Sequence, residues 1–241
     1  MVKLTEFFDT YSLRARLRPA LLTLFPALAT AASLFPKTYE TMGAGLGSLA
    51  VTCGVLVLFA QVARYLGRKK EMKLYERWGG IPTTVWLRHR DTNLDPITKK
   101  RYHDFLVEHV SKLKLPTAKE EKKNPVNADN CYRSATKWLL EYTRDRKRFP
   151  LVFEENINYG FQRNTLALKP IALVIIALCI SGTGLNIYMR PEFDPSVGYG
   201  SFISLGVSFV ALIIWIAVVS SDWVRDASDA YARALFASCD K

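Results

Sequence analysis

The sequence predicts an all-α membrane protein, in which two transmembrane helical hairpins flank a mainly helical, basic cytoplasmic domain. Three observations support this fold class. Four long runs are almost free of charged residues, although 23% of the chain is Asp, Glu, Lys or Arg. The runs form two pairs, and a short turn that contains proline joins the members of each pair. Between the pairs, residues 68–165 carry 22 Lys and Arg against 13 Asp and Glu.

The first hairpin is predicted within residues 1–67, after a short cytoplasmic N-terminal helix. Its apolar runs are residues 19–35 and residues 41–66, and the second run is uncharged up to Arg64. At about 1.5 Å per residue, the first run is close to the shortest helix that crosses a ~30 Å apolar layer. Gly43 and Gly47 form a G-x-x-x-G spacing in the second run, which lets two helices approach closely.

The second hairpin is predicted within residues 170–221. Its runs, residues 170–189 and residues 199–221, contain no charged residue. Gly200, Ser204 and Ser208 repeat every fourth residue, so they share one face of the last helix. Two interpretations of that face stay open: packing within one chain, or an oligomer interface or pore lining.

The C-terminal tail, residues 222–241, has apolar residues at helical spacing and predicts an amphipathic cytoplasmic helix that extends the last span. This helix either docks on the central domain or contacts another subunit. The positive charges predict the orientation, since cytoplasmic segments carry an excess of Lys and Arg. Both termini and the central domain, residues 68–169, are therefore expected on the cytoplasmic side of a bacterial inner membrane.

The side chains inside the spans exclude several functions. The four predicted spans contain no Asp, Glu, Lys or His. Proton pumps, coupled transporters and intramembrane proteases need ionisable groups at mid-depth, so we expect none of these activities. Outside the spans, no nucleophile and base stand in a recognisable pattern, and the histidine and cysteine spacings fit no metal site. The sequence predicts neither an enzyme nor a cofactor.

The central domain, residues 68–169, is predicted to contain helices and loops. Residues 83–88 have the pattern of a short β-like or irregular run. Asp95-Pro96 is a typical helix start, and the helix is expected to continue to about residue 112. Residues 116–130 are polar and lysine-rich, which predicts a loop, and Asp129 or Asn130 is expected to cap the helix that follows.

Two groups of basic and aromatic residues in this domain are candidates for binding an anionic ligand. Basic side chains neutralise phosphates and aromatic rings stack on exposed bases, which suits a single-stranded oligonucleotide or a nucleotide. The same charge also fits the positive-inside bias together with attraction to membrane lipid, and a protein partner is a third interpretation. The candidates are Trp86, Arg88, Arg90, Lys99, Lys100 and Arg101 in the first group, and Arg133, Lys137, Trp138, Arg144, Arg146, Lys147 and Arg148 in the second.

The layout as a whole, a short hairpin, a basic insert and a second hairpin, resembles the small four-span membrane effectors of bacterial antiphage defence systems. The chain looks most like the membrane channel component of Hailong, with the Kiwa membrane protein as a rival. The resemblance implies a channel whose soluble part binds single-stranded DNA oligomers made by a partner nucleotidyltransferase.

The expected function is therefore a homo-oligomeric pore of four subunits that an anionic ligand controls from the cytoplasm. Such a pore would depolarise the membrane and stop growth during infection. The alternative is a membrane anchor or scaffold that recruits a cytoplasmic partner protein through the basic domain.

Overall fold

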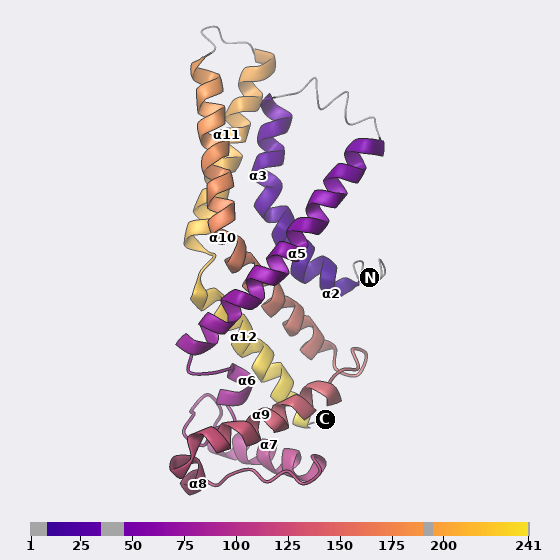
Figure 1. Cartoon of the computed structure of the whole chain (residues 1–241), viewed down its shortest axis with the longest axis vertical. Helices are drawn as coiled ribbons and strands as arrows, with labels where there is room; N and C mark the ends of the chain where they lie inside the picture. Colours follow the sequence, from indigo (N-terminus) through magenta and orange to yellow (C-terminus); the bar gives the residue numbers. More distant parts are fainter. Residues whose placement is uncertain (1–8, 35–45, 190–194, 241) are drawn as a thin grey trace. The chain divides into compact units, whose positions relative to one another are not determined.

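The computed structural model describes residues 9–34, 46–189 and 195–240, apart from the side chains of residues 46–52 and 195–198. Every regular element in these ranges is a helix, which confirms the predicted all-α class (Figure 1). In chain order the elements are α2 (Thr10–Ser12), the π-helix η1 (Leu13–Leu17), α3 (Arg18–Leu34), α5 (Leu46–Arg77), α6 (Pro82–Val85), α7 (Pro96–His109), α8 (Ala118–Lys123), α9 (Pro125–Tyr142), α10 (Pro150–Tyr188), α11 (Pro195–Ala217), α12 (Ser221–Phe236) and the 3₁₀-helix η2 (Ala237–Asp240).

Three helical segments are long and apolar enough to cross a membrane, namely Thr10–Leu34, Pro150–Tyr188 and Tyr199–Ala217. They contain or overlap the predicted runs at residues 19–35, 170–189 and 199–221. The remaining predicted run, residues 41–66, lies partly outside the described residues. Within them, α5 continues without a break to Arg77.

The helices form two compact units, each assembled from two separate stretches of the chain. The apolar unit comprises the described residues up to Lys70 together with Gly160–Val224. The central unit comprises Glu71–Tyr159 together with the residues from Arg225 onward. Three helices, α5, α10 and α12, contribute residues to both units.

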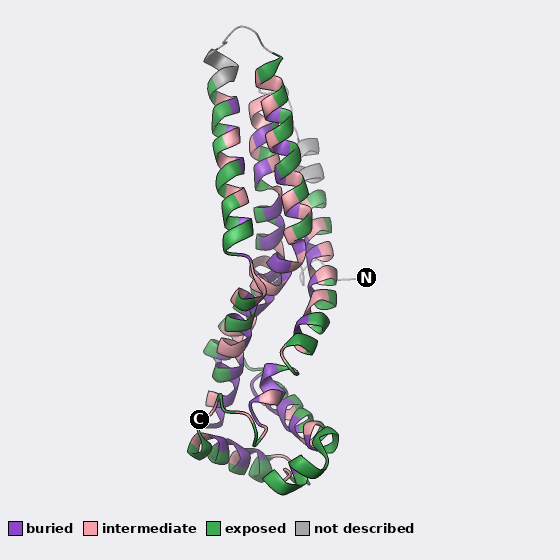
Figure 2. Cartoon of the chain, turned by 90° about the vertical axis from the view of Figure 1, so that its left-hand side faces the viewer, coloured by how far each residue is buried: buried purple, intermediate pink, exposed green. Residues whose placement is uncertain are grey.

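The apolar unit packs α3 against α11 and leaves large apolar side chains on its outside. Phe25, Leu178 and Ile213 are 57%, 68% and 64% exposed, and Figure 2 shows the outward faces of these helices as exposed. A soluble protein seldom exposes apolar surface on this scale, whereas lipid covers it without cost. The apolar unit is therefore the part that suits a membrane.

The last apolar helix ends earlier than predicted, and the tail does not simply extend it. α11 ends at Ala217, and α12 begins at Ser221. The Lys169 ammonium donates to the carbonyl oxygens of Ile216 (3.3 Å) and Val219 (2.7 Å). Ser220 Oγ accepts from the backbone N–H of Trp223 at 3.1 Å and so caps the new helix. The uncharged run gave no sign of this break, because Lys169 reaches it from another helix.

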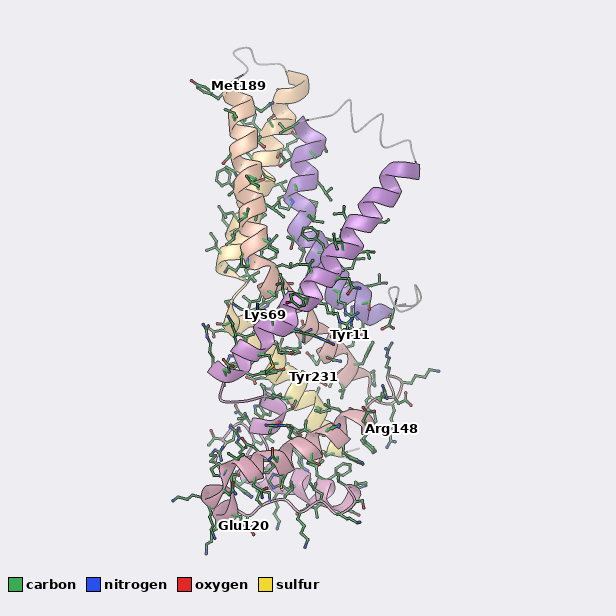
Figure 3. All side chains as sticks on the ribbon, in the orientation of Figure 1. Tyr11, Lys69, Glu120, Arg148, Met189 and Tyr231 are labelled. Atoms are coloured by element: carbon green, nitrogen blue, oxygen red, sulfur yellow. The ribbon has the colours of Figure 1, made fainter. Side chains whose placement is uncertain are left out.

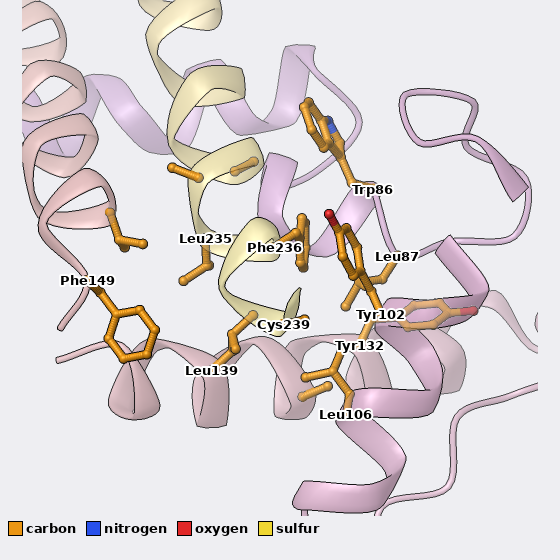
Figure 4. Close-up of a cluster of buried hydrophobic side chains, with 14 of the residues drawn as sticks. Trp86, Leu87, Tyr102, Leu106, Tyr132, Leu139, Phe149, Leu235, Phe236 and Cys239 are labelled. Carbon is orange, nitrogen blue, oxygen red and sulfur yellow. The ribbon is translucent and has the colours of Figure 1, made fainter. Parts of the chain in front are cut away.

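The core of the central unit is closed by the C-terminal residues (Figure 4). Phe236 stacks on Trp86 and Tyr102, with ring centroids 6.4 Å and 6.1 Å apart. Leu235 and Cys239 pack in the same cluster. Burial raises the pKa of the Cys239 thiol to about 12, so the thiol stays protonated and unreactive. The tail therefore docks on the central segment of its own chain, the simpler of the two alternatives.

Two local predictions for the central unit are wrong. Residues 83–85 are neither β-like nor irregular, because Pro82 at the first helical position starts α6; only residues 86–88 are irregular, as the second alternative predicts. Residues 116–130 are not a loop, since they form α8 and the start of α9. A capping box between Thr117 and Glu120 starts α8. Asn124, rather than Asp129 or Asn130, caps α9, with Pro125 at its first position.

Asp95 caps α7 as predicted, accepting from the backbone N–H groups of Ile97 and Thr98. Earlier in the chain, α5 ends before Gly79 and Gly80, whose φ angles of 76° and 137° favour glycine. These two boundaries depend on signals a few residues long. They could be predicted because nothing from elsewhere in the chain is needed to form them.

The carboxylate of Glu121 on α8 joins three other residues of the central unit. It is 2% exposed and accepts hydrogen bonds from Tyr132 Oη and the His89 N–H, both at 2.7 Å, and from Arg90 Nη1 at 2.9 Å. Burial alone would raise the pKa of Glu121. The hydrogen bonds from Tyr132, His89 and Arg90, together with the Arg90 charge, outweigh it and hold the pKa below its ordinary value.

Gly67 lets α5 approach α10 closely within the apolar unit, and this contact gives a first prediction. A Cβ at position 67 would lie 2.1 Å from Asn164 Oδ1, while the amide of Asn164 is held by a 2.7 Å bond from Nδ2 to the Ala15 carbonyl. We expect Gly67→Ala to destabilise the detergent-solubilised protein by about 1–3 kcal/mol through overpacking. Thermal unfolding measures the change.

Gly54→Ala is the matched control on the same helix. A Cβ at Gly54 has no neighbour within 4 Å, so alanine should be neutral or slightly stabilising there. Equal Tm values for the two variants would contradict the proposed close contact between α5 and α10.

Candidate anionic-ligand interface

Most of the first basic group holds the central unit together. Arg88 makes a bidentate ion pair with Asp129, through Nε at 2.8 Å and Nη2 at 2.7 Å, and also donates to the Gly79 carbonyl at 2.9 Å. Arg90 pairs with the buried Glu121. With these partners in place, the charges of both arginines are largely committed to the fold.

Two members of this group lie inside the core. Lys99 is 6% exposed, and its ammonium donates to the carbonyl oxygens of Arg88 (2.7 Å) and Asp91. Burial lowers the pKa of Lys99, although the charges of Asp91 and Glu121 act in the opposite direction. Trp86 is 4% exposed and stacks on Phe236. Neither side chain presents a charge or a ring face to a ligand from solvent.

The remaining two members are nearer the surface. Arg101 pairs with Asp240, its Nε 2.6 Å from Oδ1, and both side chains stay substantially exposed at 53% and 38%. Lys100 is exposed and belongs to no ion pair among the described residues. Lys100 alone from the first group is therefore ready to meet a phosphate without losing a contact.

The basic members of the second group are all exposed, unlike most of the first group. Arg133 and Lys137 lie four residues apart on α9, and both are exposed. Arg144 follows beyond the helix end, and its ion pair with Glu141 at 3.0 Å has side chains 81% and 64% exposed. Solvent screens such a pair strongly, so Arg144 can exchange Glu141 for a phosphate at little cost. Lys147 is also exposed in the turn between α9 and α10.

Aromatic rings contact the basic residues of the turn after α9. Trp138 and Tyr142 are half-buried and stacked, with centroids 5.0 Å apart and ring planes at 15°. Arg148, at the turn before α10 (Figure 3), lies 5.0 Å from the Tyr142 ring centroid and donates from Nη2 to Tyr142 Oη at 2.8 Å. Arg146 lies 4.4 Å from the Phe153 ring centroid. We call Arg133, Lys137, Trp138, Tyr142, Arg144, Lys147 and Arg148 the α9 strip.

Tyr142 belongs to the α9 strip but was not among the predicted ligand-binding residues. The signal was present in the sequence, since Trp138 and Tyr142 are four residues apart and so share a helix face. Trp138 also makes tilted ring contacts with Phe105 and His109 on α7, which the sequence pattern did not connect to α9. The α9 strip combines exposed positive charge with ring edges, the combination that binds single-stranded nucleic acid.

A cavity of about 730 Å³ in the same unit has a different character. Four carboxylates line it together with histidine and lysine side chains, so it is poorly suited to an anion. No group of three or more His, Cys, Asp or Glu side chains with metal-binding geometry occurs within the described residues. The acidic members of the lining are Asp91, Asp95, Asp104 and Glu108.

The predicted small-residue face of the last helix packs inside the apolar unit. Ser204 and Ser208 are 1% and 0% exposed. Ser204 Oγ lies 2.8 Å from Thr30 Oγ1 on α3 and 3.5 Å from Thr183 Oγ1 on α10. A Cβ at Gly200 would lie 2.9 Å from Ser33 Oγ. In one subunit these residues serve helix packing.

The glycine pair of the first hairpin is less informative. Gly43 lies outside the described residues. Gly47 falls in the first turn of α5, whose side-chain surroundings are not described.

No family model, curated protein or solved structure matches the chain. The fold and the surface define a class: a helical protein with three segments able to cross a membrane and a basic, compact central unit. Any more specific function has to be inferred from the chemistry of these side chains.

Proposed function

We propose that the chain is the subunit of an oligomeric membrane pore that a single-stranded oligonucleotide controls through the α9 strip. The observation that carries the pore is a line of buried hydroxyl and amide groups within an otherwise apolar bundle. Thr30, Thr183 and Ser204 form a connected hydroxyl cluster between α3, α10 and α11. Polar side chains at membrane depth commonly mark a pathway for ions or water.

Part of this polar line lacks hydrogen-bond partners. Ser33 Oγ, Asn186 Oδ1 and Ser208 Oγ are buried and have no partner among the described residues. A buried polar atom without a partner costs about 1–3 kcal/mol. A second state in which water reaches these atoms would recover that free energy, and a hydrated polar line is what a weakly selective pore requires.

The proposed topology has four spans, with α5 as the additional one. Val55, Val57 and Leu58 of α5 are 42%, 39% and 62% exposed, which is the surface expected of a helix in contact with lipid. The excess of basic residues in the central unit favours a cytoplasmic location for it and for both termini. We further propose a tetramer, since a single bundle of this size packs solid.

The ligand follows from the α9 strip, where exposed basic groups and ring edges suit phosphates and bases. A nucleotidyltransferase is the class of enzyme that would supply such an oligonucleotide. In a bacterial inner membrane the opened pore would depolarise the cell, which suits a role in antiphage defence.

Ion flux tests the pore. The full chain, reconstituted in liposomes, is expected to conduct ions in a manner that depends on an added single-stranded DNA oligomer. Ser204→Val with Ser208→Val removes two hydroxyls from the polar line and should reduce the flux severalfold. Ile203→Ala, at a position 66% exposed on the same helix, should leave it unchanged. A monomeric protein in vesicles that stay impermeable to ions, with or without the added DNA oligomer, would refute the pore.

A membrane anchor is the second candidate, and one observation favours it. The hydroxyls of Thr30, Thr183 and Ser204 bond to one another within a single chain, as they would in a solid bundle. An anchor predicts that both serine substitutions are silent, while neutralising the α9 strip abolishes recruitment of a cytoplasmic partner. Ion flux and recruitment of the partner therefore distinguish the pore from the anchor.

A further inference from the structure

Four arginines gather in the apolar unit, and none of them belongs to the α9 strip. Arg16 lies on η1, Arg64 and Arg68 lie one turn apart on α5, and Arg163 lies on α10. The charges of Arg64, Arg68 and Arg163 all act on the guanidinium of Arg16. Three separate elements thus bring like charges to one place, which we call the arginine cluster.

Close backbone packing creates this arrangement. Gly67 lies between Arg64 and Arg68 on the side of α5 that contacts α10, and a Cβ there would lie 3.4 Å from Arg163 Nε. Asn164, the next residue of α10, bonds to the Ala15 carbonyl and so fixes η1 against α10. A Cβ at Gly160 would lie 3.1 Å from Ala15 Cβ, so η1 and α10 are also close one turn earlier on α10.

The groups that contact the Arg16 guanidinium carry no formal charge. Arg16 Nη1 donates to Ser12 Oγ at 3.1 Å, and its guanidinium lies 5.4 Å from the Tyr11 ring centroid. Among the described residues, no ion pair involves Arg16, Arg64 or Arg68. Like charges held together repel, and a bound anion would relieve that repulsion.

The position of the cluster along its helices indicates which anion. Arg16 comes just before the apolar stretch of α3, Arg64 just after that of α5, and Arg163 just before that of α10. Each arginine therefore stands where a membrane helix passes from apolar to charged sequence, the depth of lipid headgroups. On the apolar side, Leu22 and Phe25 of α3 and Leu58 of α5 are 48%, 57% and 62% exposed, a surface suited to acyl chains.

We propose that the arginine cluster is a binding site for the phosphate headgroup of an anionic phospholipid, with the acyl chains lying along α3 and α5. Guanidinium groups bind phosphate oxygens through paired N–H donors, and basic pockets between membrane helices on the cytoplasmic side hold such headgroups. This site uses none of the residues of the α9 strip and does not depend on pore activity.

Lipid titration followed by native mass spectrometry tests the site on the full chain in a neutral detergent. The wild-type protein should bind phosphatidylglycerol more tightly than phosphatidylcholine with the same acyl chains. Arg16→Gln with Arg64→Gln should weaken phosphatidylglycerol binding about 25-fold, or about fivefold for each arginine. Lys119→Gln with Lys122→Gln, which removes two exposed charges from α8, should leave it unchanged.

Three results would overturn the assignment. Equal wild-type affinity for the two lipids would do so without any variant, even if the arginine variant failed to fold. An equal loss in the Lys119 and Lys122 control would show that general charge, rather than the cluster, attracts the lipid. Displacement of bound phosphatidylglycerol by an equimolar amount of inorganic phosphate would show that the site takes free phosphate.

Discussion

Replacing Glu121 with alanine is expected to lower the free energy of unfolding of the central unit by about 3 kcal/mol, because it leaves buried partners without an acceptor. Tyr132 Oη and the His89 N–H each lose a 2.7 Å hydrogen bond, and Arg90 loses its closest carboxylate. Denaturant unfolding of the full chain in detergent, followed by the fluorescence of Trp86 and Trp138, measures the loss. Hydrogen exchange should place the increased opening in α8 and α9.

The neighbouring residue supplies the control. Glu120 has the same charge and the same helix, but it is exposed and serves the capping box with Thr117. Glu120→Ala should cost about 1 kcal/mol. Similar losses for the two variants would mean that the buried carboxylate has no special role.

The effect of pH distinguishes the stability contributed by the charge of Glu121 from that contributed by its packing. The pKa of Glu121 is held below its ordinary value in the folded protein. Its ionised form therefore stabilises the fold fully above the unfolded-state value of about 4.3, and this contribution is lost as the pH falls through the folded-state pKa. The difference between the wild type and Glu121→Gln should be largest at neutral pH and shrink under acid. A difference independent of pH would assign the effect to packing.

Neutralising the α9 strip is expected to produce the largest change in ligand binding. In the triple variant Arg133→Gln, Lys137→Gln and Lys147→Gln, about three phosphate contacts are lost. The slope of log K against log salt for a single-stranded DNA oligomer should then fall by about 2, or roughly 0.7 for each contact. Fluorescence anisotropy across a salt series on the full chain measures the slope and the affinity together.

A second triple variant distinguishes binding at a specific site from nonspecific attraction by positive charge. Lys114, Lys119 and Lys122 are exposed lysines of the same unit that lie outside the α9 strip. Their replacement by glutamine changes the net charge by the same amount and should leave the slope close to the wild-type value. Identical losses in the two triple variants would identify the affinity as nonspecific, and the proposed ligand would then lose its structural support.

The parts of the fold that could be predicted from the sequence depend on local signals. The start of α7 at Asp95-Pro96, the end of α5 before Gly79 and the long apolar runs each need only a few neighbouring residues. The parts that could not be predicted depend on distant ones. α8 is only six residues long, and the Glu121 side chain ties it to residues of α9 and the segment after α6.

The candidate site divides in the same way. In the sequence, Lys99 and Arg88 belong to a basic stretch that predicts an exposed patch. The backbone carbonyl that accepts from Lys99 and the Asp129 carboxylate that pairs with Arg88 meet them only in the folded chain. Trp86 likewise needs Phe236, from the far end of the chain, to become a core residue. The α9 strip could be predicted more fully because one helix and its adjoining turn present most of it.

The closure of the central core by Phe236 and Cys239 also has a consequence for biosynthesis. The ribosome makes residues 71–159 first, and α12 follows only after the apolar stretches of α10 and α11. At about 5–20 residues per second, the unfinished core waits several seconds for its last helix. Synthesis of those apolar stretches therefore precedes completion of the core, and a nascent chain that stalls before α12 would expose Trp86 and Tyr102 to chaperones and proteases.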